Sequence, residues 1–421
     1  MPTPAPHKQP HQTQWEKVKL GDIGEVITGK TPSTDKLEYW DSKDYMFITP
    51  PDLKRGTTIY QASRYISAKG LQSIKTNSIS GFSILVGCIG SDLGNIACVD
   101  STCATNQQIN ALTNIKPQCN THYVYHYLTL LKKYFRQIAA ITTAPIVSKS
   151  MFENIKIPLP PLPTQENIAQ ILSTLDKKIE LNTRINTELE SMAKLLYTRY
   201  FVEYNFPDSS GKPYKTSGGA MVYNPTLKRE IPQDWEVIKL ANRFNFERGE
   251  EFGTASYKES KVNKHHIKFY RVGDMIDDSK CVYVDSSKEN APLISENDLL
   301  VSFDGSVGRV AYGLNGTYSS GIRKITDKHG EICQSGLYFI FTDSHIQHTI
   351  NQHATGTNIK HAGSAIENLY MPYSKEVFSD FQNKINSMFA LIRHTKAQSQ
   401  RLAEWRDYLL PLLMGDQVEV V

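Results

Sequence analysis

Two short stretches of the sequence carry residue types that could do chemistry. Glu259–Lys261 has the carboxylate–x–lysine form of metal-dependent nucleases, and Asp234 would be its upstream carboxylate. Asp304–Ser306 places a hydroxyl beside a carboxylate, but its residue types predict a turn first, and no paired histidine accompanies the serine. A three-residue match arises by chance in a chain of 421 residues. We therefore expect no catalytic residue, and a nuclease using Glu259 and Lys261 stays an alternative.

The motifs that usually mark an enzyme or a metal site do not occur. The sequence has no GxGxxG, no GxxxxGK[ST] and no HExxH. Thr49–Asp52 resembles the Asn/Asp-Pro-Pro-aromatic loop of amino-methyltransferases only superficially, and we interpret it as a turn. None of the six cysteines forms a CxxC pair. We expect neither a metal nor a cofactor in this chain.

Composition sets the class of protein. Hydrophobic residues make up 40% of the chain and charged residues 21%, which is ordinary for a soluble protein with more than one core. A net charge of +4 is compatible with binding a polyanion through local patches. Neither a signal peptide nor an apolar run of about 20 residues is visible. We predict a cytoplasmic protein with reduced cysteines and no membrane contact.

The sequence repeats itself at a nearly constant offset. The matching residues are Trp15, Glu16, Lys19, Leu20, Gly29 and Thr34 with Trp235, Glu236, Lys239, Leu240, Gly249 and Thr254, then Gly94, Ala97, Glu153, Asn154 and Pro158 with Gly308, Ala311, Glu367, Asn368 and Pro372. The first six pairs are 220 residues apart and the last five 214. Their conserved order predicts an internal duplication.

Each half ends in a heptad pattern. The first apolar seam is Ile168, Leu172, Leu175, Ile179, Asn182, Asn186, Leu189, Ala193, Leu196 and Tyr200, and 213 residues later the second is Phe381, Ile385, Met388, Ile392, Thr395, Ser399, Leu402, Arg406, Leu409 and Leu413. This spacing, with a polar pair at the same place in both, predicts two helices of about 50 Å that pack together. We expect Trp405 to replace Arg406 in the seam. Thr164 and Ser374 are the candidate N-caps.

The remaining segments show a mixture of strand-like and helix-like patterns. Short β-like runs such as Tyr45–Thr49, Ser83–Val86 and Leu299–Phe303 accompany helical stretches at Tyr123–Ile138 and Ser344–Gln352. The fold class we predict is α+β, with two pseudo-symmetric mixed α/β domains separated by a pair of long antiparallel coiled-coil helices. The expected boundaries are a disordered arm at 1–14, domain 1 at 15–160, the first helix at 161–204, a linker at 205–234, domain 2 at 235–373, the second helix at 374–414 and a tail at 415–421.

With the repeat in place, the chain resembles the specificity subunit of a type I restriction-modification enzyme over nearly its whole length. The segments that carry the resemblance are the Gly-x-Thr-Pro loop Gly29–Ser33, the Asn-Gln-x-Ile strand within Ala104–Ile109, the proline-rich start of the first helix at Ile157–Glu166, and the bridge Gly211–Tyr214 with Ile231–Glu236. The proline-rich segment is the most specific of these. The second half departs from the pattern, with Glu250–Phe252 and Ser320–Ile322 at the corresponding places.

The resemblance implies a non-catalytic subunit that recognises a bipartite double-stranded DNA target through two target recognition domains. It implies two methyltransferase subunits docked on the helices, with restriction and translocase subunits joining them. S-adenosylmethionine, ATP and magnesium would serve the partner subunits. The system would methylate DNA and defend the cell against foreign DNA.

Candidate DNA contacts are fork donors and small hydroxyls in glycine- or proline-punctuated stretches or in family-like segments. We select Lys30, Thr31, Lys54, Arg55, Asn106, Gln107 and Lys149 in the first half, and Arg248, Arg271, Arg309, Arg323, Lys324 and Lys360 in the second. Two further alternatives stay open beside the nuclease: a specificity subunit of a methylation-only complex, and a coiled-coil scaffold with no DNA role.

Overall fold

The computed structural model describes residues 15–54, 58–140, 145–278, 281–287, 291–357 and 359–415. The chain divides into two compact units. Unit 1 comprises residues 1–183 and 397–421, and unit 2 comprises residues 184–396. The predicted arm at 1–14 and all but the first residue of the predicted tail at 415–421 lie outside the described residues.

Unit 1 carries three sheets. Its strands and helices are β1 (Glu16–Lys19), α1 (Leu20–Ile23), β2 (Glu25–Thr28), β3 (Tyr45–Ile48), β4 (Arg64–Ile66), α2 (Ala68–Ser73), β5 (Ser78–Ile79), β6 (Phe82–Gly87), β7 (Ile96–Asp100), β8 (Cys103–Thr105), β9 (Ile109–Thr113), α3 (Thr121–Leu130), α4 (Lys132–Ala139), α5 (Lys149–Glu153) and β10 (Lys156–Leu159). The sheet orders are β1-β10, β2-β9-β6-β7 and β4-β3-β8-β5. The central strands β6 and β9 are buried nearly throughout.

Unit 2 repeats this arrangement. Its elements are β11 (Met221–Asn224), β12 (Arg229–Pro232), β13 (Glu236–Lys239), α7 (Leu240–Arg243), β14 (Phe244–Arg248), β15 (His266–Tyr270), β16 (Val282–Asp285), β17 (Leu293–Ile294), β18 (Leu299–Ser302), β19 (Val310–Tyr312), β20 (Gly316–Tyr318), β21 (Ile322–Asp327), α8 (Gln334–Thr342), α9 (Ser344–Gln352) and β22 (Tyr370–Tyr373). The sheet orders β13-β22, β14-β21-β18-β19 and β16-β15-β20-β17 match those of unit 1 strand for strand.

The duplication predicted from weak sequence matches is therefore a duplication of topology. In both units one pair of neighbouring strands is parallel, β3 with β8 and β15 with β20. The hairpin β11-β12 lies within the predicted linker. Gly94 and Gly308, which the repeat aligns, both adopt positive φ, at 81° and 82°. Because only glycine takes this conformation readily, its recurrence has a physical cause.

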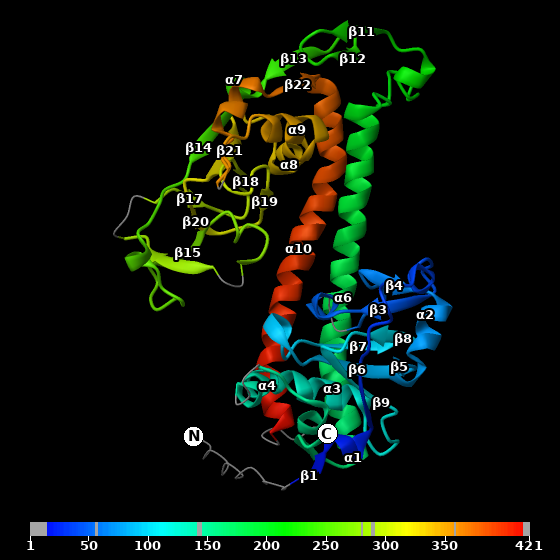
Figure 1. Ribbon diagram of the computed structural model, residues 1–421. Helices are drawn as coiled ribbons and strands as arrows, with labels where there is room; N and C mark the ends of the chain where they lie inside the picture. Colours follow the sequence, from blue (N-terminus) through cyan, green and yellow to red (C-terminus); the bar gives the residue numbers. More distant parts are fainter. Residues whose placement is uncertain are drawn as a thin grey trace, which may run out of the picture. The chain divides into compact units, whose positions relative to one another are not determined.

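Two long helices, α6 (Leu162–Tyr197) and α10 (Lys375–Met414), each contribute to both units. In each unit a stretch of α6 lies beside a stretch of α10 (Figure 1). In unit 1, Asp176 binds Arg406 and Asn182 binds Ser399, so partner numbers fall as α6 advances and the helices are antiparallel. In unit 2 the seam continues with a hydrogen bond from Thr395 to Asn186.

The predicted polar pairs in the two seams bind each other. Asn182 Nδ2 donates to Ser399 Oγ at 3.1 Å in unit 1. Thr395 Oγ1 donates to Asn186 Oδ1 within unit 2. A buried polar pair of this kind fixes the register of two helices, because a shifted register would leave its groups unpaired.

Two expectations for the helices are wrong, and a third is confirmed. Trp405 is exposed, whereas Arg406 turns into the seam and pairs with Asp176 at 2.9 Å. Thr164 is not an N-cap, because α6 already begins at Leu162 and Pro163 occupies the first turn, where a missing N–H costs nothing. Ser374 is confirmed as the residue directly before α10, and its carbonyl accepts from the Phe378 N–H at 2.9 Å.

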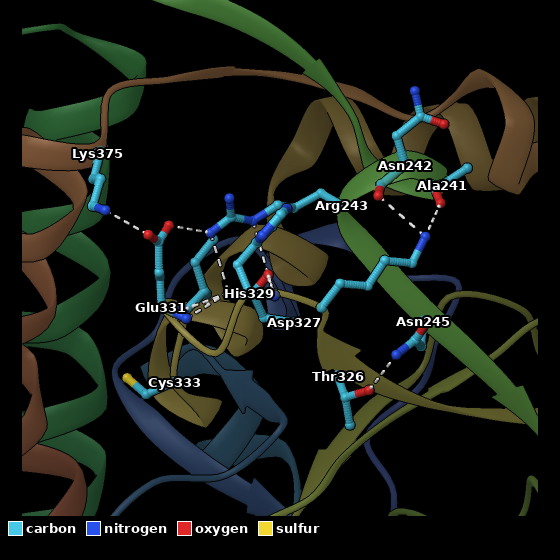
Figure 2. A network of polar contacts seen from close by, with 12 residues as sticks. Ala241, Asn242, Arg243, Asn245, Thr326, Asp327, His329, Glu331, Cys333 and Lys375 are labelled. Atoms are coloured by element: carbon cyan, nitrogen blue, oxygen red, sulfur yellow. Dashed lines mark hydrogen bonds and ion pairs between the residues drawn. The ribbon is translucent and has the colours of Figure 1, made fainter.

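Each unit attaches its sheets to the long helices through a different polar contact. In unit 1, Gln165 of α6 accepts from the Asn120 N–H and donates to the Pro160 carbonyl. In unit 2, an ionic network joins Arg243 to Asp327 at 2.8 Å and to Glu331 at 2.7 Å, and Glu331 also binds Lys375 at the start of α10 (Figure 2). These two cations hold the pKa of the Glu331 carboxyl at about 2.

The apolar cores lie where the sheets meet the helices. In unit 1, Leu410, Leu413 and Met414 from the end of α10 join Ile168 and Leu172 of α6 in one cluster. In unit 2, aromatic residues of α6 and α10 pack on α8 in the same way. No helix in the described part of the chain is both long and apolar enough to cross a membrane.

Candidate nucleic-acid interface

The same loop corner occurs in both units. The loop after β2 (residues 29–33) packs on the turn before β9 (residues 106–108), and the loop after β14 (249–253) packs on residues 319–321 before β21. We call each of these the strand-end corner. A Cβ on Gly29 would lie 2.2 Å from the Asn106 carbonyl oxygen, and one on Gly249 would lie 2.3 Å from that of Ser319. Only glycine fits there, which explains why these two glycines recur.

The corner of unit 1 collects four of the predicted contact residues: Lys30, Thr31, Asn106 and Gln107. Thr31 Oγ1 donates to Gln107 Oε1 at 2.9 Å across the corner. Lys30 and Gln107 are exposed. The Asn106 amide instead shapes the turn, because its Oδ1 accepts from the Gln108 N–H and its Nδ2 donates to Gln108 Oε1. Lys30, Thr31 and Gln107 are thus the residues of this corner that can meet a ligand.

The other candidates of unit 1 lie elsewhere. Lys149 is the first residue of α5 and pairs with Glu153 one turn later, at 3.7 Å. Lys54 is the last residue of a 3-10 turn at Pro50–Lys54. Arg55 lies outside the described residues. The predicted turn at Thr49–Asp52 is confirmed, with the buried Asp52 carboxylate accepting from the N–H and hydroxyl of Thr49.

The corner of unit 2 is rich in guanidinium groups. Arg248 and Arg323 face each other across β14 and β21, and both donate to the carbonyl of Ser320, at 3.2 Å and 2.5 Å. Burial, and then the charge of Arg248, lower the pKa of Arg323. Two predicted cations therefore lie side by side in this corner, whereas the predicted contacts in the corner of unit 1 include one, Lys30.

Two more arginines are held close to this corner by polar contacts. Arg309 donates to the carbonyl of Val272 at 2.9 Å, and Val272 lies against Gly321 of the corner. Arg271 binds the buried Asp274 through Nε at 2.7 Å. Lys360 is exposed, and its carbonyl accepts from the Gly305 N–H. Lys324 differs, because it pairs with Glu247 at 2.8 Å and donates to the Leu293 carbonyl.

Sequence reasoning missed two side-chain contacts of the unit 2 corner. His361 Nδ1 lies 2.7 Å from Asp304 Oδ1, and the Asp304 N–H donates to the carbonyl of Gly321. Ser320 donates its hydroxyl to Glu251 at 2.6 Å. These partners are separated by 57 and 69 residues, so no local pattern could have joined them.

The chemistry of both corners is hydrogen-bond donation. Lys30, Gln107 and Arg248 are exposed donors there, which suits the acceptor-rich edges and phosphates of DNA. Within the described ranges no group of three His, Cys, Asp or Glu side chains could hold a metal ion. Glu259 and Lys261 are exposed residues of the loop before β15, whereas Asp234 precedes β13.

The family model described as "Type I restriction modification DNA specificity domain" matches residues 12–191 and 232–388. The chain belongs to this family. Each matched segment begins just before β1 or β13 and ends within α6 or α10, so the family domain coincides with the structural repeat. The strand-end corners are therefore equivalent parts of two DNA specificity domains, and the chain is a type I restriction-modification specificity subunit.

Relatives of this specificity subunit match nearly all of it or a part of it. The type I restriction enzyme MjaIX specificity subunit of Methanocaldococcus jannaschii is 26% identical over 96% of this chain and 94% of its own. The HindI specificity subunit of Haemophilus influenzae is 30% identical over 44% of this chain and 40% of its own. The crystal structure of the type I restriction-modification S subunit from M. genitalium covers 96% of this chain and 97% of its own, with a TM-score of 0.58 at 15% identity, which shows a shared fold.

Proposed function

We propose that this specificity subunit reads a bipartite double-stranded DNA target, with one half-site bound at the strand-end corner of each unit. The observation that carries the proposal is the recurrence of one donor-rich corner on two copies of one framework. The chain itself contributes no catalytic residue. S-adenosylmethionine, ATP and magnesium serve the methyltransferase and restriction subunits, in the cytoplasm, where the target DNA lies.

Genome-wide adenine methylation, mapped in cells with and without this chain, tests the proposal. We expect one bipartite motif to lose its methylation when the chain is deleted. If only that motif loses methylation while other motifs in the genome keep theirs, the chain determines which sequence is modified. An unchanged methylation pattern, together with no salt-dependent DNA binding by the assembled complex, would favour the scaffold alternative. Metal-dependent cleavage by the purified chain alone would favour the nuclease.

The paired helices set the distance between the half-sites in this proposal. We expect that inserting seven residues between Asn182 and Asn186, with seven more beside Thr395, changes the preferred spacer and keeps both half-sites. Seven residues add about 10 Å to a helix, which is roughly three base pairs at ~3.4 Å each. An insertion in α6 alone is the control, because it breaks the bond from Thr395 to Asn186 and should abolish the assembly. An unchanged spacer would contradict this role.

Two equivalent surface patches support two copies of one partner. Met192 and Leu195 on α6 are 53% and 70% exposed, and Trp405 and Tyr408, 213 residues later on α10, are 63% and 70% exposed. Residues three apart share a helix face. Large apolar side chains that stay exposed at the same position of both repeats mark a repeated docking site. We assign one methyltransferase subunit to each patch.

Native mass spectrometry of the complex tests this assignment. Replacing Met192 and Leu195 with serine should remove one methyltransferase subunit, and replacing Trp405 and Tyr408 should remove the other. Leu181→Ser is the matched control, because Leu181 is also exposed on α6, at 45%, but its repeat counterpart is His394. Retention of both subunits by both double variants would move the docking site elsewhere.

A further inference from the structure

The two strand-end corners differ at one pair of facing residues. In unit 1 the last residue of β2, Thr28, lies opposite Asn110 of β9. In unit 2 the last residue of β14, Arg248, lies opposite Arg323 of β21. The two pairs occupy the same place in the repeated sheet, so the comparison isolates the effect of the side chains.

The pair in unit 1 is closed. Thr28 Oγ1 donates to Asn110 Oδ1 at 2.7 Å. Asn110 Nδ2 donates to the carbonyl of Val147 and to Cys88 Sγ, both at 3.3 Å. Asn110 is buried, and its amide is used inside the protein. A ligand at this corner therefore meets the loop residues Lys30, Thr31 and Gln107 rather than the strand pair.

The pair in unit 2 is open and electrostatically unfavourable. Like charges directly opposite each other destabilise a sheet. Burial, and then the charge of Arg248, lower the pKa of Arg323. The carbonyl of Ser320 accepts from both side chains, and the carbonyl of Ile322 also accepts from Arg323, at 3.1 Å. Among the described residues, the terminal nitrogens of Arg248 and Nη2 of Arg323 have no hydrogen-bond partner. The carboxylate of Asp304, which also acts on Arg323, is bound by His361.

We infer that Arg248 and Arg323 read guanine in the half-site bound by unit 2, and that this base preference is specific to unit 2. The inference rests on the proposed function. Guanine presents two acceptors, O6 and N7, in the major groove, and the planar arginine fork matches them. A guanidinium held by a backbone carbonyl on a strand is pre-organised, so its fork loses less conformational entropy when it binds a fixed base edge.

Methylation of a randomised DNA library by the assembled complex tests the inference. Arg323→Lys keeps the charge but loses the fork, so it should reduce the preference for guanine by about ten- to one-hundred-fold at one position. The effect should appear in one half-site, with the other half-site unchanged. Arg248→Lys should act on the same half-site. Lys239→Gln is the control and should leave both half-sites unchanged, because it removes a positive charge from unit 2 at a residue that pairs with Glu367 and is not a predicted contact.

Substituting 7-deazaguanine in that half-site provides a second readout that does not depend on folding of a variant. The wild-type complex should lose about tenfold in binding to the modified DNA, and the Arg323→Lys complex should lose little. A half-site of unit 2 that lacks guanine on both strands would overturn the inference. Full sequence preference in the Arg323→Lys complex, together with an Arg323→Ala complex that loses binding equally across all sequences, would also overturn it, because that pattern marks a phosphate contact. Absence of any sequence-specific methylation would instead overturn the proposed function.

Discussion

Unit 1 and unit 2 pack a helix against the two long helices at equivalent positions, with charged side chains in unit 1 and apolar side chains in unit 2. Three equivalent positions join the helix after β9 or β21 to the long helices, and they are filled by His126, Asp176 and Arg406 in unit 1 and by Phe339, Phe389 and Ala193 in unit 2. Asp176 binds Arg406 at 2.9 Å and lies 3.8 Å from His126 Nδ1. The rings of Phe339 and Phe389 lie 5.8 Å apart.

The difference teaches that the framework constrains the shape of this contact more than its polarity. A buried ion pair is seldom more stable than an apolar pair of similar volume, but breaking it is costly. We interpret the charged contact as one that disfavours pairing of the helix segments of unit 1 with those of unit 2. An exchanged pairing would leave a carboxylate facing a phenylalanine.

The largest effect is expected where unit 2 uses charge and unit 1 does not. Arg243→Ala leaves the buried Asp327 carboxylate without its cation, and we expect a loss of about 3 kcal/mol in the free energy of unfolding. Gln165→Ala in unit 1 removes only neutral hydrogen bonds and should cost about 1–2 kcal/mol. Hydrogen exchange measured separately on β21 and β9 resolves the two. Lys239→Ala, which breaks the exposed pair with Glu367, should change little. An equal loss of stability in the Arg243→Ala and Gln165→Ala variants would show that charge does not strengthen the contact between the sheets and the long helices.

A smaller effect is expected from breaking the charged contact of unit 1. Asp176→Ala removes the buried partner of the partly buried Arg406 and leaves it the exposed Asp407, so it should lower the free energy of unfolding by about 2–3 kcal/mol. Installing the residues of unit 2 at both positions, as Asp176→Phe with Arg406→Ala, should restore most of that loss. Thermal unfolding of both variants measures the difference. If the double variant is as unstable as the single one, the two contacts are not interchangeable.

The smallest effect is a difference in pH response between the units. Burial, followed by the charges of His122 and Arg406, lowers the pKa of His126 to about 3, and these outweigh the nearby Asp176 carboxylate. A depressed histidine pKa means that the unfolded chain binds the extra proton, so stability is lost as pH falls from about 6.5 towards 3. Between pH 7 and pH 5 unit 1 should lose about 2 kcal/mol.

Hydrogen exchange in α3 and α8, followed as a function of pH, checks this expectation. The equivalent of His126 in unit 2 is Phe339, so α8 should not show the same loss. His126→Phe is the matched variant and should remove the pH dependence of α3. Burial raises the pKa of Asp176, which acts in the opposite sense and reduces the net effect. An equal loss of hydrogen-exchange protection in α3 and α8 on acidification would contradict this difference between the units.

The long helices and the duplication could be predicted because both are periodic. The expected helix starts of 161 and 374 differ from the observed Leu162 and Lys375 by one residue each. The seam failed at Arg406 because its partner Asp176 lies 230 residues away in sequence. A strict heptad also drifts against 3.6 residues per turn, which brought Asp176 rather than Leu175 into the buried position.

Other features had no local signal. The helix α8 was not predicted, because Leu337–Phe341 is apolar on nearly every face and its pattern does not separate a helix from a strand. The strand-end corners were partly predicted, through Lys30, Thr31, Gln107, Arg248 and Arg323. The carbonyl of Ser320 that orients two arginines, and the pair of His361 with Asp304, depend on the folded backbone. Whether these residues contact DNA stays a prediction.

The composition of unit 1 sets an order of events during synthesis. Its core contains Leu410, Leu413 and Met414, which leave the ribosome more than 200 residues after Ile168 and Leu172. At 5–20 residues per second that delay is roughly 10–40 s. Unit 2, in contrast, is one continuous segment. The half of the protein that is made first is therefore the half that is finished last, and during the delay its apolar helix face is exposed to chaperones and to neighbouring nascent chains.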